Sequence, residues 1–374
     1  MLILIIVIII IIVIIVCVVK YKESFTNVPV ILHISCYGYG NMGDNMYKEV
    51  FNKFIPEYKI ISISDHSLFV DRKHQIIRNI PKDDLKFDYL LFGGGGLLLA
   101  DKLQKSKNIL HYFNLAKKYN APLLVVSCGI QGNITNFNNT FKDWKDFIDY
   151  ASLITVRSPT DKQLLYDYMI HHNIGNVEKL HYFRDLGYIY PRIVPKVRTN
   201  DKYITLIIAG PIHDKNEELL RQIQNKPNKI IIMNMGSIYD DDNNNRIMQM
   251  NIPNTIRKYY GSGKAKELTT KNTVILNQKK MEEYLHQNRN DLNPSDLDLQ
   301  TVIHIIYNSE KVYTGRYHGM IFSRSLGIPY STMGMGTNKV LWEEPDSSDT
   351  YENSLKNIEY LRKYLNLKNV DLRI

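Results

Sequence analysis

Along most of this 374-residue chain, short apolar runs typical of buried strands alternate with segments of helical spacing. The run VPVILHISCYG (28–38) is followed by NMGDNMYKEVFNKFIP (41–56), in which Met46, Val50 and Phe54 recur at helical intervals. Similar strand–helix pairs follow, and a second series begins at DKYITLIIAGP (201–211). Because parallel strands need crossover helices, this alternation predicts an α/β fold with parallel sheets covered by helices on both faces.

The length of the chain allows two domains, each with its own core. Between the two series lies PKVRTNDK, a polar stretch that contains proline, and it predicts a hinge at residues 196–202. We therefore expect an N-terminal domain over residues 29–195 and a C-terminal domain over residues 203–345.

The last segment, residues 346–374, is expected to form an amphipathic helix and a tail. Within it, Leu355, Ile358, Leu361 and Leu365 fall on one face of a helix, with charged residues between them. The pattern predicts a helix that packs on the rest of the protein through this apolar face.

The N-terminal residues 1–19, MLILIIVIIIIIVIIVCVV, contain no charged side chain. As a helix with a rise of about 1.5 Å per residue, this run nearly spans a hydrocarbon layer of about 30 Å. A cleaved signal peptide would begin with basic residues and end at a small-residue cleavage site. We predict one transmembrane helix, a single-pass anchor, followed by a polar stem at residues 20–28. Lys20 and Lys22 favour a cytosolic domain after it.

Charge and composition narrow the possible partners. The net charge of +9 is spread along the chain, without a basic block interleaved with aromatic residues, so we expect no nucleic-acid partner. The three cysteines give no disulfide framework. Eleven histidines occur without HExxH or CxxC spacing, and we predict no metal.

Arginine and histidine follow two of the predicted strands directly. Arg157 ends LITV and precedes Ser158-Pro159, while Arg316 and His318 in KVYTGRYHGM begin the next helix. The carboxyl edge of a parallel sheet is where ligands bind, and guanidinium groups suit carboxylate or phosphate. The alternatives are a structural salt bridge for Arg157, a turn cap for Arg316 and a satisfied core histidine for His318.

Two glycine-rich stretches have a similar setting. In CYGYGNMGDNMYKEV, the glycines, Gly43 among them, leave backbone amides accessible, and Asp44 and Asn45 fall at the helix start, where a carboxylate can be only a cap. In YLLFGGGGLLL, we expect the strand to end at the run Gly93 to Gly96. Close approach of a ligand and close helix–strand packing both explain such a run.

Asp185 lies in LHYFRDLGYIYP, after a short apolar run near the predicted domain junction. Carboxylates are common in turns because they accept bonds from nearby backbone amides. We expect Asp185 to be an ordinary turn carboxylate.

Taken together, YGNMGDN, FGGGGLLL, VSCGIQG, LITVRSPTDKQLL, RDLGYIYP and GRYHGMIFSRSLGIPYSTM resemble the polysaccharide pyruvyl transferase family in order and approximate spacing. The resemblance covers most of residues 30–340, and its most specific part is Arg-x-His-Gly followed by Gly-Ile-Pro. It implies two Rossmann-like domains facing across a cleft, similar to the GT-B glycosyltransferases. It also implies transfer of a pyruvyl group from phosphoenolpyruvate to two hydroxyls of a glycan sugar, forming a ketal.

The resemblance implies roles for particular residues. Phosphoenolpyruvate carries a phosphate and a carboxylate, so its site needs convergent cationic groups, and the anion-binding arginine and second-domain histidine of the family correspond to Arg157 and His318. His318 is the expected proton donor or phosphate partner, and Asp44 the expected base. The expected donor-binding residues are Arg157, Arg316, Gly43, Asn45, Gly94, Gly95 and Lys339. No cofactor is expected beyond the donor substrate.

Two other interpretations stay open. One is a GT-B-like glycosyltransferase that uses a nucleotide sugar, and the other is a non-catalytic membrane-anchored relic of the same scaffold. The anchor resembles that of Golgi-resident eukaryotic members, which favours a lumenal enzyme, against Lys20 and Lys22.

Overall fold

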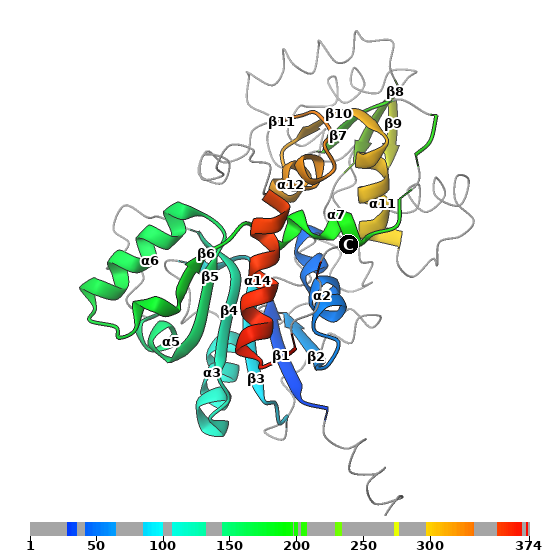
Figure 1. Ribbon diagram of the computed structural model, residues 1–374. Coiled ribbons are helices and arrows are strands. Elements are labelled where there is room, and N and C mark those ends of the chain that lie inside the picture. Colours follow the sequence, from blue (N-terminus) through cyan, green and yellow to red (C-terminus); the bar gives the residue numbers. More distant parts are fainter. Residues whose placement is uncertain are drawn as a thin grey trace, which may run out of the picture.

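The computed structural model describes two parallel sheets with their helices (Figure 1). The described residues are 28–35, 42–64, 85–99, 107–131, 144–196, 198–200, 203–207, 229–233, 273–276, 297–332, 350–368 and 372. The predicted anchor, residues 1–19, lies outside them. Within the described ranges, no helix has both the length and the apolar character needed to cross a membrane.

The first sheet has six strands in the order β2-β1-β3-β4-β5-β6, and every neighbouring pair is parallel. Their bounds are β1 (Val30–Ser35), β2 (Lys59–Ser64), β3 (Tyr89–Leu99), β4 (Leu123–Gln131), β5 (Ala151–Val156) and β6 (Leu180–Tyr182). Most of these strands are nearly continuous apolar runs, which is the pattern of a sheet buried on both faces.

Successive residues of the central strands enter two different cores. Ile31 and Leu124 belong to one cluster of buried side chains, while their neighbours Leu32 and Val125 belong to the other. This follows from the alternation of side chains along a strand.

Helices cover both faces of this sheet. The helices and 3₁₀ turns of this part are α2 (Met42–Phe54), α3 (Lys107–Tyr119), α5 (Lys145–Tyr150), α6 (Pro159–His171), η3 (Val177–Lys179), η4 (Leu186–Tyr188) and α7 (Tyr190–Ile193). The apolar side chains of α2 join the cluster of Ile31, and those of α3, α5 and α6 join the cluster of Leu32. The predicted α/β class is therefore confirmed for this half.

The glycine run does not end its strand, contrary to our expectation, because β3 continues through it to Leu99. Gly94 and Gly95 have φ of +80° and +81°, a region that side chains rarely adopt, and the register with β4 shifts between Gly95 and Leu98. A Cβ atom at Gly93 would overlap the backbone carbonyl of Val126. Glycine thus allows a close, irregular pairing of two central strands.

The second sheet has five parallel strands in the order β11-β10-β7-β8-β9. Its elements are β7 (Tyr203–Ile207), β8 (Lys229–Met233), β9 (Thr273–Leu276), α11 (Leu297–Tyr307), β10 (Ser309–Thr314), α12 (Tyr317–Ser325) and β11 (Tyr330–Thr332). The cluster of buried residues that contains α2 continues into α11 and α12, so the two halves share apolar packing.

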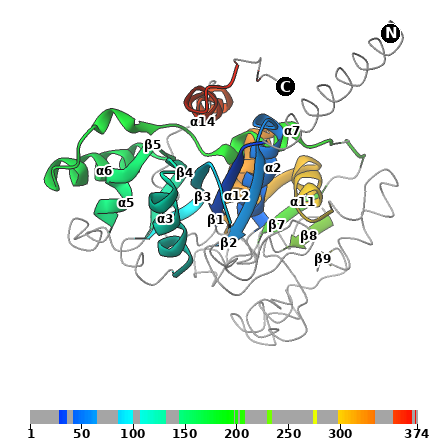
Figure 2. The same cartoon turned by 90° about the horizontal axis from the view of Figure 1, so that it is seen from below.

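The last helix, α14 (Thr350–Tyr364), returns to the first sheet. Leu355, Ile358, Leu361 and Leu365 are all buried, which confirms the predicted apolar face. They pack in the cluster of α2, on the face opposite α3, and Figure 2 shows α14 and α3 on opposite sides of the sheet. At its C-terminal end, Arg362 pairs with Glu57 at 2.9 Å.

Candidate active site

Two strand ends present the predicted cationic residues. Arg157 follows β5 immediately, and the side chain of Ser158 accepts a hydrogen bond from the amide of Asp161 to cap α6. Arg316 is the N-cap residue of α12, and His318 lies in its first turn. The hydroxyl of Thr314 accepts from the Arg316 amide at 3.0 Å and donates to its carbonyl at 2.9 Å, which fixes this turn. The predicted strand–helix junctions are confirmed.

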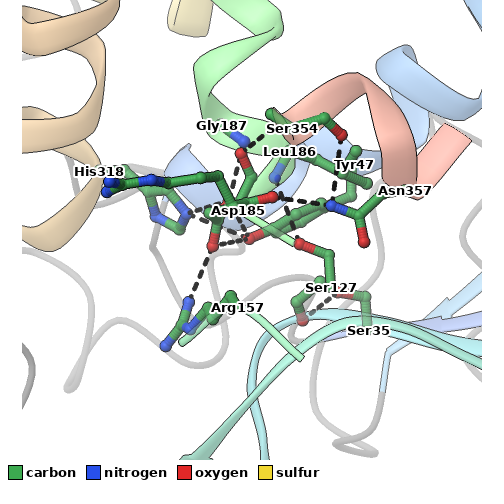
Figure 3. Close-up of polar contacts among 12 residues, drawn as sticks. Ser35, Tyr47, Ser127, Arg157, Asp185, Leu186, Gly187, His318, Ser354 and Asn357 are labelled. Atoms are coloured by element: carbon green, nitrogen blue, oxygen red, sulfur yellow. Dashed lines mark hydrogen bonds and ion pairs between the residues drawn. The ribbon is translucent and has the colours of Figure 1, made fainter. Parts of the chain in front are cut away.

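Asp185, just before η4, is the centre of the site (Figure 3). Its side chain is 0% exposed. The Tyr47 hydroxyl lies 3.0 Å from both carboxylate oxygens, Arg157 Nη1 lies 3.1 Å from Oδ2, and the amide of Gly187 donates to Oδ1 at 2.8 Å. A buried carboxylate is stable only when it is paired in this way.

His318 approaches the same carboxylate from the second sheet. Its Nε2 lies 3.2 Å from the Tyr47 hydroxyl and 3.9 Å from Asp185 Oδ1, and the residue is 3% exposed. Tyr47 and Asp185 belong to the first half of the fold, whereas His318 belongs to the second. One buried polar cluster therefore joins the two halves.

Arg157 lies between Asp185 and an aromatic ring of the second half. Its guanidinium carbon is 4.5 Å from the centroid of the Tyr317 ring, and the residue is 7% exposed. Burial alone would lower the pKa of Arg157, but Tyr317, Asp185 and Tyr47 together hold it well above its ordinary value. The salt bridge that we considered as an alternative is formed, with Asp185 as partner. Donor binding by Arg157 stays a prediction.

Several glycines make room for this cluster. A Cβ atom at Gly43 would lie less than 3.0 Å from the His318 ring, one at Gly94 would overlap the Tyr47 ring, and one at Gly129 would overlap the Arg157 guanidinium. Gly94 therefore serves close packing, the second of the two explanations that we gave for the glycine run. Donor contacts of Gly43, Gly94 and Gly95 stay predictions.

Three predicted residues cannot be placed in the site. Asp44 and Asn45 belong to the first turn of α2. Their backbone is described, but their side chains are outside the described part of the structure. Lys339 lies outside the described residues altogether. Their roles stay predictions.

Asp185 is more than the ordinary turn carboxylate that we expected. It does cap η4, as a turn residue would, through the amide of Gly187. The same carboxylate also binds Tyr47 and Arg157. These contacts could not be predicted from the sequence, because they join residues 138 and 28 positions apart. Tyr47 had one available signal: it adjoins the apolar stripe of α2, and a buried tyrosine needs a partner for its hydroxyl.

A shell of hydrogen bonds holds the backbone around Asp185. The Leu186 amide donates to the Ser127 hydroxyl at 3.2 Å, and the Ser354 hydroxyl donates to the Asp185 carbonyl at 2.7 Å. Ser127 has φ of +54°, a strained conformation for a residue with a side chain. From α14, the Asn357 amide donates to the carbonyl of Arg184 at 2.7 Å.

Comparisons with known proteins agree with this architecture. The family model described as polysaccharide pyruvyl transferase matches residues 37–330. No curated protein matches the chain. Among solved structures, a UDP-N-acetylglucosamine 2-epimerase is similar with a TM-score of 0.51 at 12% identity, over 93% of this chain and 99% of that one. The epimerase of Rickettsia bellii has a TM-score of 0.48 at 12% identity, over 91% and 97% of the two chains. The likeness to the first epimerase, with the two parallel sheets, supports a GT-B-like α/β fold.

Proposed function

Since the chain belongs to the polysaccharide pyruvyl transferase family and is a pyruvyltransferase, we propose that its donor is phosphoenolpyruvate and its product a cyclic ketal on a glycan sugar. The pyruvyl group becomes bonded to two hydroxyls of one sugar, and inorganic phosphate leaves. The acceptor is a glycan, in keeping with the family.

The cationic groups at the two sheet edges are the proposed donor site. Phosphoenolpyruvate carries two anionic groups within a few ångströms, so a single cation cannot hold it. Arg157 and Arg316 bind its phosphate and carboxylate through paired N–H donors, and Gly43 and Asn45 contribute from the first turn of α2. Gly94, Gly95 and Lys339 complete the proposed donor contacts.

The proposed chemistry begins with a proton transfer to carbon. His318 gives a proton to C3 of the enol, C2 becomes cation-like, and one sugar hydroxyl bonds to C2 while its own proton goes to the base, Asp44. The C2–O bond to phosphate then breaks, and the second hydroxyl closes the ketal on C2 as its proton passes to the departing phosphate, which leaves as hydrogen phosphate. One donor and one diol thus give one ketal and one phosphate.

The observation that supports this function most is the link between the two halves at Asp185. The carboxylate binds Arg157 from the edge of the first sheet at 3.1 Å and lies 3.9 Å from His318 at the edge of the second. Arg157, with a proposed donor role, and His318, the proposed acid, therefore lie within one cluster, which supports a site shared by the two halves.

The membrane anchor is part of the proposal. We propose, from their uninterrupted apolar sequence, that residues 1–19 anchor the enzyme in a membrane by a single pass, with the stem at 20–28 as spacer. The arrangement seen in Golgi-resident members favours the lumenal side.

Ligand-induced stabilisation tests the donor assignment. The full-length chain in detergent is heated with phosphoenolpyruvate or with a panel of nucleotide sugars. Phosphoenolpyruvate at about 100 times its Kd should stabilise the fold by about 2.7 kcal/mol. Arg316→Ala should lose most of this stabilisation. Lys162→Ala, which removes the same charge from the exposed face of α6, should keep it. Stabilisation by nucleotide sugars alone would instead support a glycosyltransferase.

A further inference from the structure

We propose that Tyr47 and Asp185 are positioning residues that hold His318 in its Nε2–H tautomer, with Nδ1 on the side of the ring that faces α2. The assignment of a tautomer rests on hydrogen-bond geometry alone. Its catalytic meaning rests on the proposed function, in which His318 supplies a proton.

The first step of the argument is the charge on Asp185. Arg157 Nη1 and the Gly187 amide are donors that cannot accept a hydrogen bond, and they occupy Oδ2 and Oδ1, respectively. The Tyr47 hydroxyl also donates to both oxygens, at 3.0 Å each. A carboxyl group that receives all these donors is ionised and accepts hydrogen bonds only.

The second step concerns the single hydrogen of the Tyr47 hydroxyl. Because this hydrogen points to Asp185, the phenolic oxygen can take part in its contact with His318 only as an acceptor. The partner atom, His318 Nε2, lies 3.2 Å from that oxygen and must therefore carry a hydrogen. The direction of donation in this series of hydrogen bonds is therefore fixed: His318 donates to Tyr47, and Tyr47 donates to Asp185.

The third step places the other nitrogen of the ring. A Cβ atom at Gly43 would overlap Nδ1, so this atom lies directly against the second residue of α2. Nδ1 faces the first turn of that helix, where Gly43 and Asn45 are proposed to bind the donor. The hydrogen bond to Tyr47 therefore uses the ring nitrogen that is farther from α2, and Nδ1 is the nitrogen beside its first turn.

The chain of hydrogen bonds also crosses the interface between the halves. Tyr47 is on α2 and Asp185 precedes η4, whereas His318 is on α12. The tautomer is thus set only while the two sheets keep this arrangement.

Nitrogen NMR of labelled histidine tests the assignment directly. The full-length chain is labelled with ¹⁵N-histidine, and two-bond ¹H–¹⁵N correlations are recorded at rising pH until His318 is neutral. His318→Gln identifies the resonances by their loss. The wild type should show the Nε2–H pattern, and an Nδ1–H pattern in the wild type would overturn the proposal without any variant.

Tyr47→Phe then isolates the hydroxyl, because it keeps the ring that packs on Gly94. It should move the neutral ring toward a mixture of tautomers. Tyr203→Phe is the matched control, since Tyr203 is equally buried but its hydroxyl donates to the carbonyl of Ile305 in the second half, and it should leave the Nε2–H pattern intact. An unchanged pattern in Tyr47→Phe would contradict the proposal.

Steady-state kinetics test the catalytic consequence of this tautomer. Tyr47→Phe should lower kcat by about 10²-fold, while the KM for phosphoenolpyruvate changes less than about threefold, since proton transfer and not donor binding is impaired. A loss confined to KM would contradict a positioning role. If the wild type showed the Nε2–H tautomer but no pyruvyl transfer, the proposed function would fail while the structural assignment stood.

Discussion

At the scale of single residues, Asp185 has to be compensated because its carboxylate is removed from water. Arg157 supplies a full positive charge at 3.1 Å, and Tyr47 and the Gly187 amide supply neutral donors. Truncation of one partner leaves part of a buried charge unpaired, which is strongly destabilising. Substitutions at this cluster therefore need stability measurements beside activity.

His33, on β1, gives a prediction about pH. It is fully buried, with Nε2 3.1 Å from the Gly93 carbonyl, and burial lowers its pKa from 6.5 to about 4 although this hydrogen bond opposes the shift. In the unfolded chain His33 is protonated below about pH 6.5, whereas in the folded chain it is protonated only below about pH 4. The free energy of unfolding therefore falls as the pH falls from about 6.5 to about 4. Between about pH 7 and pH 5, His33 should cost the wild type about 2 kcal/mol of unfolding free energy.

Urea unfolding at both pH values checks this prediction. His33→Gln keeps an amide donor near the Gly93 carbonyl but cannot be protonated, so its stability should depend less on pH by about 2 kcal/mol. Equal pH dependence in the two proteins would show that His33 titrates normally in the folded state.

At the scale of elements, local pattern predicted most of the secondary structure. The stripe of Met46, Val50 and Phe54 became the buried face of α2, because helical spacing is a property of neighbouring residues. The three-residue strand β6 is too short to give a pattern. The strand β3 continues through its glycines, against our expectation, because a run of glycines fits both the end of a strand and an irregular strand.

The partner of α14 could not be predicted, because an apolar stripe does not specify which surface covers it. Asn357 on this helix accepts a hydrogen bond from Thr155 at 2.6 Å and donates to the Arg184 carbonyl at 2.7 Å. Asn357→Ala removes the hydrogen-bond partner of the buried Thr155 hydroxyl and of the Arg184 carbonyl. It should therefore destabilise the fold by about 2–4 kcal/mol. Lys356→Ala, one residue earlier on the exposed side, should change stability by less than about 0.5 kcal/mol.

Thermal or urea unfolding of the two variants measures this difference. Similar stabilities would mean that α14 is held by its apolar face alone. A selective loss in Asn357→Ala would show that the polar contacts also fix the segment that carries Asp185.

At the scale of the whole molecule, the site depends on the placement of two sheets. The positions of Arg157, Arg316 and His318 at strand ends could be predicted from the sequence, since local pattern reveals where a strand ends. It could not identify Tyr47 as the link, because its contacts with Asp185 and His318 span 138 and 271 residues along the chain. Such contacts arise from tertiary packing, which no short pattern encodes.

The central claim is that the two sheet edges together transfer a pyruvyl group from phosphoenolpyruvate to a glycan. Mass spectrometry of a glycan panel, after incubation with the full-length chain and phosphoenolpyruvate, tests it most directly. We expect one glycan to gain the mass of one pyruvate less one water, with one phosphate released per transfer, and His318→Gln to abolish both. Folded enzyme that binds phosphoenolpyruvate but modifies no glycan in a broad panel, or a product formed equally by His318→Gln, would contradict the account.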